Sequence, residues 1–234
     1  MDYRDFTIVL PTLNEEGTIG ILVRRLIRRY HGIRIMVMDD GSTDRTEMAV
    51  SAASKLNSNV SFFNRKKAGR ERGLTASVVD GILKSRTRFV IVMDADLQHP
   101  PEIVGRISKG LSEGHGLVVA IRSSVKGWEL HRKIVSMVLM GIGYAILVAT
   151  GRSRCNDIFS GFFGVDRRLF TKKYNENRGR FIGGGYKVLY DFLKCNRSGS
   201  VSIGQVPYSF GLRESGASKA GLTQGIMLFK SFLT

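Results

Sequence analysis

The feature that most constrains the fold of this chain is a unit that recurs through its first half. Each unit has a short apolar segment, a polar turn and then a helix, such as the one with an apolar face of Ile19, Leu22, Val23, Leu26 and Ile27. The apolar segments are predicted strands and lie at residues 6–10, 33–38, 60–63, 89–93 and 117–121. Strands that alternate with helices at this spacing predict an α/β fold, with a doubly wound, mostly parallel sheet and helices on both faces.

The stretch from Arg88 to Glu102, RFVIVMDADLQHPPE, is the most informative of these units. Its apolar run is typical of a strand buried on both faces, and Asp94 and Asp96 leave that strand with their carboxylates pointing the same way. A lone D-A-D is more often a solvated turn, but its position after a buried strand favours a ligand site. Two hard oxygen donors, with Gln98 as a third, predict a site for Mg²⁺ or Mn²⁺ that also takes phosphate oxygens.

Acidic residues also follow other predicted strands. Right-handed crossovers bring the carboxyl ends of parallel strands to one edge of a sheet. We therefore expect a cluster of carboxylates at that edge, formed by Glu15, Asp39, Asp40, Asp94 and Asp96. Five clustered carboxylates are costly without a cation, which again favours a bound metal. The sequence has neither a G-x-G-x-x-G after the first strand nor a G-x-x-x-x-G-K-[ST] loop, so a nucleotide would be held in another way.

The alternation of strands and helices stops after Arg122. Residues 134–149 form a run of sixteen residues without charge, short of the roughly 20 needed to span a bilayer. This run is either a buried core helix or a helix lying in the membrane interface, and the second is supported by the flanking cations Arg132, Lys133, Arg152 and Arg154. We expect one domain over residues 1–234, with interfacial amphipathic helices at 131–150 and 221–234.

The rest of the second half carries four weaker signals. Residues 157–165 are a predicted strand with two glycines that allow another group to approach the backbone closely. Residues 185–195 are a predicted helix carrying Asp191, and residues 201–210 a predicted strand. Residues 211–221 have the composition of a mobile loop whose two cations are Arg213 and Lys219.

The charge of the chain narrows the class of partner. A formal net charge of +16 indicates an anionic partner, which could be nucleic acid, a phosphorylated metabolite or an acidic membrane surface. Nucleic-acid binders show clustered cations with aromatic stacking rather than acidic turns after strands, so a nucleic-acid binding protein is only a distant alternative. Cys155 and Cys195 lack metal spacing and are expected to be free thiols. The opening MDYRD carries no apolar export signal, which fits the cytoplasmic face of a membrane.

Six stretches of the chain stand in an order that is typical of one family. They are PTLNEE, MDDGSTDRT, GLTASVVDG, MDADLQHPPE, DIFSGFFGVDR and FGLRESGASK. Together they resemble the dolichol-phosphate mannose synthase group of family 2 glycosyltransferases over nearly the whole chain. The resemblance implies a GT-A fold and inverting transfer of mannose from GDP-mannose to dolichyl (polyprenyl) phosphate for protein glycosylation, with a divalent metal. A related enzyme using UDP-glucose or another nucleotide sugar is the alternative, and a membrane-anchoring partner subunit is left open.

The resemblance also implies roles for individual residues. Contacts to the nucleotide sugar are expected from Pro11, Leu13, Glu15, Val37, Asp39, Asp94, Ala95, Asp96, Gln98, Arg122, Arg213 and Lys219. The metal is expected on Asp94, Asp96 and Gln98, and Asp191 stands where the family has a Glu near the metal. The expected catalytic residues are Asp96, Arg213 and Lys219.

The acceptor phosphate is expected on Arg122, Arg132 and Ser136. Arg132 and Ser136 are four residues apart and share one helix face beside the apolar run. A phosphate acceptor is already ionised near neutral pH, since its second pKa is about 6, so no catalytic base is required. His99, beside the D-A-D, is therefore expected to be a structural neighbour.

Overall fold

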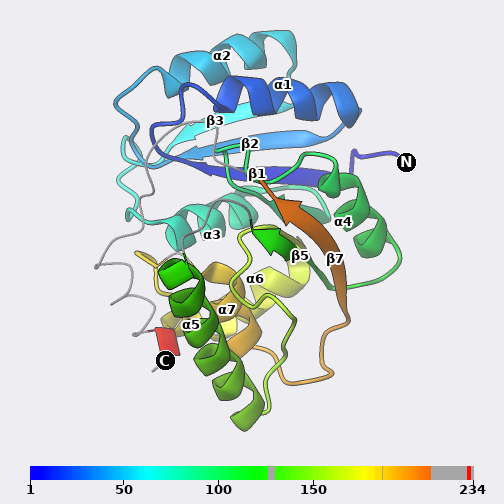
Figure 1. The fold of residues 1–234 in the computed structure, drawn as a ribbon. Helices are drawn as coiled ribbons and strands as arrows, with labels where there is room; N and C mark the ends of the chain where they lie inside the picture. Colours follow the sequence, from blue (N-terminus) through cyan, green and yellow to red (C-terminus); the bar gives the residue numbers. More distant parts are fainter. Residues whose placement is uncertain (126–129, 186, 212–230, 233–234) are drawn as a thin grey trace.

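The computed structural model describes residues 1–125, 130–185, 187–211 and 231–232, with the side chains of residues 56 and 124–133 outside that description. Its centre is a sheet with the strand order β3-β2-β1-β4-β6-β5-β7 (Figure 1). The strands are β1 (Phe6–Thr12), β2 (Arg34–Asp39), β3 (Val60–Asn64), β4 (Phe89–Val92), β5 (Leu117–Val125), β6 (Phe163–Asp166) and β7 (Ile203–Phe210). The helices are α1 (Ile19–Arg29), α2 (Thr46–Leu56), α3 (Leu74–Lys84), α4 (Ile103–Ser112), α5 (Leu130–Ala149), α6 (Arg167–Glu176), the 3-10 helix η1 (Arg178–Arg180) and α7 (Val188–Lys194).

The sheet is mostly parallel, which confirms the predicted architecture. β1 pairs in parallel with β2 and β4, β2 with β3, and β5 with β7. Among the strands described, β6 alone is antiparallel, lying between β4 and β5. The first residue of β6, Phe163, is paired with the last residue of β4, Val92, so the chain re-enters the sheet from its carboxyl edge after α5.

Helices cover both faces of the sheet, as the alternation of strands and helices predicted. Along β1, Ile8 faces the core formed with Leu22 and Ile107 of α1 and α4, whereas Val9 faces the core formed with Val78 of α3. In Figure 1, α1 and α2 lie above the sheet, and α3, α6 and α7 lie below it. All of these core side chains are almost completely shielded from solvent.

The second half departs from the sequence prediction in two places. The strand predicted over residues 157–165 is wrong for most of its length, because strand pairing begins only at Phe163. The sequence analysis predicted no element at α6, whose first turn is capped by the carboxylate of Asp166. Gly164 allows the close approach that was expected, because a Cβ atom there would lie 2.5 Å from Ile107 of α4 and 2.7 Å from Leu111.

The helix α5 extends away from the sheet beside the described C-terminal residues (Figure 1). Its inward residue Leu147 is fully buried, but Val138 is 56% exposed. The exposed large apolar side chains of α5 are Ile134, Val135, Met137, Val138, Ile142, Tyr144 and Val148. The alternative of a helix buried all round in the core is therefore wrong. Of the helices in the described residues, none is long and apolar enough to cross a membrane.

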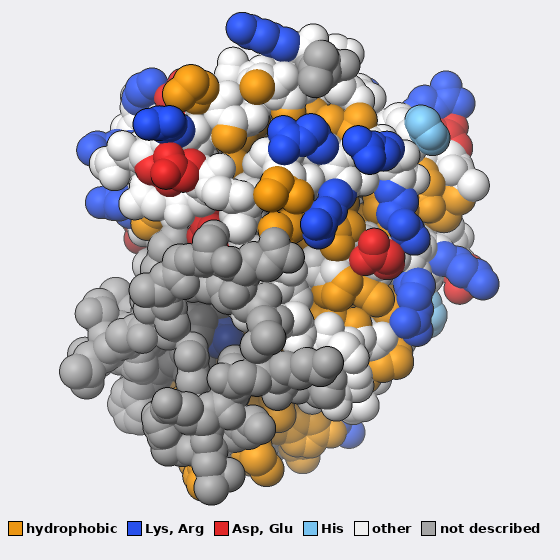
Figure 2. Space-filling model, turned by 45° about the horizontal axis from the view of Figure 1, so that its top comes forward, with side chains coloured by type: hydrophobic (Ala, Val, Ile, Leu, Met, Phe, Trp, Pro, Cys, Tyr) orange, Lys and Arg blue, Asp and Glu red, His pale blue; other side chains and the backbone are white. Residues whose placement is uncertain are grey.

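Basic side chains are spread over the face that carries α1 and α2. Figure 2 looks onto this face and shows many Lys and Arg side chains with few Asp or Glu among them. The arginines of α1 contribute, because Arg24, Arg25, Arg28 and Arg29 are all exposed. These residues account for part of the net charge of +16.

Candidate functional site

The carboxyl ends of β1 and β2 are held side by side, with Thr12 opposite Asp39. The two turns that follow are interlocked through Asn14, whose side-chain oxygen accepts from the backbone N–H of Thr43 at 2.8 Å. The backbone N–H of Asn14 donates to the hydroxyl of Ser42 at 2.8 Å, and Asn14 adopts a left-handed φ of 53°. Asn tolerates this conformation better than most residues. Of the predicted nucleotide contacts, Pro11 is held by the pairing of β1 with β2, Leu13 immediately precedes Asn14, and the backbone N–H of Glu15 donates to the hydroxyl of Thr46 at 2.9 Å.

The side chain of Asp39 is fixed by hydrogen bonds from the turn that follows it. Its side chain accepts from the backbone N–H groups of Gly41 and Ser42, both at 3.0 Å, and from the hydroxyl of Ser42. The residue is only 1% exposed. Charge-assisted bonds of this kind fix a carboxylate strongly. Asp39 therefore organises the β2–α2 turn, next to the buried side chain of Val37.

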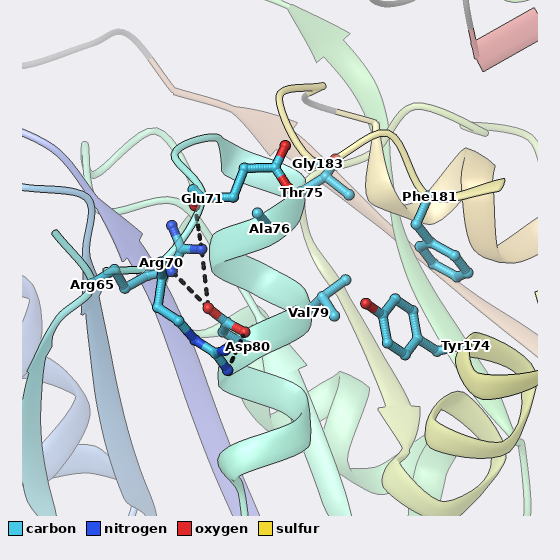
Figure 3. A pocket seen from close by; sticks show the side chains of 10 residues that line it. All are labelled: Arg65, Arg70, Glu71, Thr75, Ala76, Val79, Asp80, Tyr174, Phe181 and Gly183. Atoms are coloured by element: carbon cyan, nitrogen blue, oxygen red, sulfur yellow. Dashed lines mark hydrogen bonds and ion pairs between the residues drawn. The ribbon is translucent and has the colours of Figure 1, made fainter. Parts of the chain in front are cut away.

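Asp40 points away from the expected carboxylate cluster. It forms an ion pair with Arg65, which is 1% exposed, and accepts from the backbone N–H of Gly73 at 2.7 Å. Arg65 also contacts Asp80 at 3.0 Å, and Figure 3 shows Asp80 bonded to both Arg65 and Arg70 in the wall of a cavity of about 220 Å³. None of the residues lining this cavity is a predicted site residue. The expectation that Asp40 joins the cluster is wrong, because a buried guanidinium neutralises it.

Asp94, Ala95 and Asp96 follow β4 at the centre of the same edge. The Asp94 side chain is 37% exposed, whereas Asp96 is 5% exposed and accepts from the backbone N–H of Gln98 at 3.1 Å. The side-chain amide of Gln98 donates to the carbonyl of Gly211 at 3.1 Å, which ties this loop to the end of β7. The first glycine of the predicted strand segment, Gly161, approaches Asp94 closely: a Cβ atom there would lie 3.3 Å from its carboxylate.

His99 supports this loop from beneath. Its Nδ1 accepts from the backbone N–H of Asp94 at 3.1 Å, which leaves the proton on Nε2, 3.8 Å from the Asp94 carboxylate. The ring is stacked on Phe162 with a centroid distance of 4.9 Å. Burial lowers the pKa of His99, so the imidazole is neutral near pH 7 and adds no charge. This placement agrees with the expectation that His99 is a structural neighbour.

Two cations, Arg122 and Lys187, lie beside the D-A-D loop. The sequence did not predict the partner of Arg122 or any role for Lys187. Arg122 forms a bidentate pair with Asp157, at 2.7 and 2.8 Å, and both side chains are mostly buried. Lys187 donates to the carbonyl of Phe159 at 3.3 Å. Burial and the charge of Arg122 lower the pKa of Lys187 to about 8, while Asp157 and Asp94 oppose that shift. The D-I-F-S-G-F-F-G stretch was the available signal for Asp157; for Lys187 the sequence offered none.

Several predicted residues cannot be placed. Arg213 and Lys219 lie outside the described residues, and the side chain of Arg132 lies outside the described side chains. Ser136 is described and is partly buried on α5. Asp191 is 1% exposed on α7 and forms an ion pair with Lys194 at 3.2 Å.

The side-chain oxygens at the carboxyl edge of the sheet determine which metal ion could bind there. Among the described residues, no three His, Cys, Asp or Glu side chains come together to hold a metal ion, so the predicted five-carboxylate cluster does not form. Asp94 and Asp96 remain as two hard oxygen donors on one loop. Such a pair fits Mg²⁺ or Mn²⁺, which are commonly bound through one or two carboxylates plus substrate phosphates and water.

The comparisons with known proteins agree with this architecture. A family model, Glycosyl transferase family 2, matches residues 7–173. Two relatives named dolichol-phosphate mannosyltransferase, from Mycosarcoma maydis and Saccharomyces cerevisiae, are 33% and 30% identical to this chain. They align over 96% and 92% of this chain, and over 75% and 80% of their own lengths.

A solved structure shows the same fold. It is the glucosyl-3-phosphoglycerate synthase of Mycobacterium tuberculosis in complex with Mn²⁺, UDP-glucose and glycerol 3-phosphate, with a TM-score of 0.65 and 21% identity. The similarity covers 97% of this chain and 76% of that one, and it confirms the expected GT-A fold. Because the family model spans most of the chain, and both relatives align over more than 90% of it, this chain belongs to glycosyl transferase family 2.

Proposed function

We propose that this glycosyltransferase moves mannose from GDP-mannose to a dolichyl or other polyprenyl phosphate, with inversion at the sugar carbon. The observation that carries this proposal is the placement of two oppositely charged groups of side chains in one site. Asp94 and Asp96 lie at the sheet edge, and the charges of Arg122 and Lys187 lie close enough to Asp94 to interact with it. The names of the two relatives supply the sugar and the lipid.

The acidic part of the site suits the donor diphosphate. Asp94 and Asp96 would hold Mg²⁺ or Mn²⁺, with Gln98 as the further oxygen donor expected from the sequence. When bound, such a metal supplies positive charge that neutralises the departing diphosphate. The interlocked turns carry Leu13 and Glu15, and they continue the strand ends that hold Pro11, Val37 and Asp39, so this edge of the sheet is a rigid platform on which we propose the nucleoside binds. Arg213 and Lys219 are proposed as further cations for the diphosphate.

The cationic part suits a phosphate acceptor. Arg122 is held in one orientation by two bonds to Asp157, so its position costs little entropy when a phosphate binds. Lys187 adds a compact charge that points toward the carbonyl of Phe159. Since the acceptor phosphate is already an anion, the residues only need to bind and orient it. Neutral His99 is not required as a base.

The surface of α5 suits a lipid substrate. Its outward side is apolar and exposed, and Ser136, a proposed acceptor-phosphate residue with Arg122 and Arg132, lies on the same helix. An apolar helix surface flanked by cations binds membrane interfaces through insertion and charge together. We therefore propose that the protein works at the cytoplasmic face of a membrane, without spanning it through α5.

A donor screen tests the proposed function. The purified protein is incubated with a short polyprenyl phosphate and with GDP-mannose, UDP-glucose or another nucleotide sugar, with and without EDTA. Transfer from GDP-mannose that EDTA abolishes and Mg²⁺ or Mn²⁺ restores is expected. Faster transfer from UDP-glucose than from GDP-mannose would refute the proposed donor. Transfer that persists in EDTA would refute the proposed role of a metal.

A further inference from the structure

A buried polar cluster joins α7 to the described C-terminal residues. Asp191, Lys194 and Ser231 are 1%, 4% and 3% exposed. The Asp191 carboxylate contacts the Lys194 ammonium at 3.2 Å and accepts from the Ser231 hydroxyl at 2.5 Å, both through Oδ1. The Lys194 ammonium also donates to the carbonyl of Ser231 at 2.6 Å. We call these three residues the C-terminal clasp, and Figure 1 shows the C-terminal residues beside α5 and α7.

Both oxygens of the Asp191 carboxylate have partners inside the protein. Its second oxygen, Oδ2, accepts from the backbone N–H of Ile182 at 3.3 Å. Burying a carboxylate is costly, and the ammonium together with these hydrogen bonds offsets that cost. A metal at Asp191 would have to compete with the Lys194 ammonium and the Ser231 hydroxyl for Oδ1, and with the Ile182 N–H for Oδ2.

The clasp holds an aromatic residue against the proposed acceptor side of the site. Phe232, directly after Ser231, packs edge-on against Tyr190 of α7 at a centroid distance of 5.6 Å and lies 6.3 Å from the ring of Phe159. The carbonyl of Phe159 accepts from Lys187, and its ring lies 5.2 Å from the same ammonium. A chain of direct contacts therefore runs from the clasp through Phe232 and Phe159 to Lys187.

Phe232 also contacts the helix that we propose to lie at the membrane. A Cβ atom added at Gly143 of α5 would lie 3.2 Å from the Phe232 ring. The hydroxyl of Tyr190 donates to the carbonyl of the same glycine at 3.4 Å. The lack of a side chain at Gly143 thus lets α5, α7 and Phe232 meet at one point.

We propose that Asp191 is a positioning residue, which with Lys194 and Ser231 holds Phe232 against the acceptor side of the site, and that it is not a metal ligand. This inference rests on the proposed function, because only that proposal assigns the region around Lys187 to the acceptor phosphate. The resemblance to the family implied that the residue at this position lies near the metal. We propose instead that Asp191, whose side chain is shorter than the Glu of the family, has a structural role.

Thermal unfolding in EDTA tests the clasp without donor or acceptor. Asp191→Asn should lower the midpoint by roughly 5 °C or more, because it leaves the buried Lys194 ammonium without its counter-charge. Ser231→Ala should lower it less, and the double variant should fall by less than the sum of the two. An unchanged midpoint for Asp191→Asn, or strict additivity, would overturn the clasp. A failed donor screen would leave this result untouched.

Kinetics at 20 °C then separate positioning from ligation and from simple stability. Asp191→Asn and Phe232→Ala should each lower kcat/KM for the lipid phosphate about tenfold, with the Mn²⁺ concentration for half-maximal activity within twofold of wild type. A metal ligand would instead raise that concentration about tenfold or more, in Asp191→Asn alone. A folded Phe232→Ala with wild-type kinetics would also overturn the proposal. If Asp191→Asn does not fold, Ser231→Ala takes its place, because it removes one bond to the same carboxylate.

Discussion

The outward side of α5 gives the sharpest test of how this protein meets the lipid substrate that we propose. The seven exposed apolar side chains of α5 are each between 40% and 66% exposed. Full burial of such a side chain stabilises by about 1.5–3 kcal/mol, so inserting each exposed half contributes about 1 kcal/mol. Val138→Glu removes one such contribution and places a carboxylate in the interface. We expect a total loss of about 3 kcal/mol, which weakens liposome binding about 100-fold.

Two matched variants control for charge and for folding. Met48→Glu introduces the same charge at a 62% exposed apolar residue of α2, and it should leave liposome binding nearly unchanged. Leu147→Glu introduces it at a fully buried residue of α5, and it should unfold the protein.

Co-sedimentation with anionic liposomes at low and high salt, beside circular dichroism, reads out all four proteins. Wild-type binding should weaken in high salt, because the cationic contribution is screened. If wild type fails to bind at low salt, or if Val138→Glu is folded and binds like wild type, the membrane role of α5 is refuted.

Three further predictions concern the site. Asp96→Asn should nearly abolish turnover while circular dichroism stays native, because it removes a proposed metal carboxylate from a loop; turnover at the wild-type rate would contradict this. Lys187 is charged below a pKa of about 8 and neutral above it, so kcat/KM for the lipid phosphate should fall as pH rises through 8, and Lys187→Met should lack that fall. Lys219→Ala should lower kcat more than it weakens binding of GDP, measured calorimetrically; equal losses would assign it to ground-state binding.

Much of the fold was predictable because its signals are local. The strand of Phe89–Val92 is continuous and apolar, and the apolar face of α1 has helical spacing, so both could be recognised from neighbouring residues. The antiparallel direction of β6 was not predictable, since it depends on the edge from which the chain returns after α5. The capping of α6 by Asp166 is local, but that helix is strongly polar on average and offers few apolar residues by which to recognise it.

The acidic residues of the proposed site could be named from the sequence, whereas the ion pairs of its cationic residues could not. Asp94 and Asp96 follow a buried strand, and that position alone indicates a site. Asp40 was misassigned because its partner, Arg65, is 25 residues away and the pairing depends on the tertiary fold. The pairing of Arg122 with Asp157, 35 residues apart, and that of Ser231 with Asp191, 40 residues apart, also depend on the tertiary fold and could not be predicted from neighbouring residues.

The most direct test of the central claim compares two acceptors that differ only in the phosphate. Purified protein with Mg²⁺ or Mn²⁺ and GDP-mannose is given either a short polyprenyl phosphate or the matching polyprenol, and the anomeric configuration of any product is determined by NMR. The account predicts a mannosyl phosphate of inverted configuration from the polyprenyl phosphate and no product from the polyprenol. Equal transfer to the polyprenol, a product of retained configuration, or no transfer to the polyprenyl phosphate would contradict it.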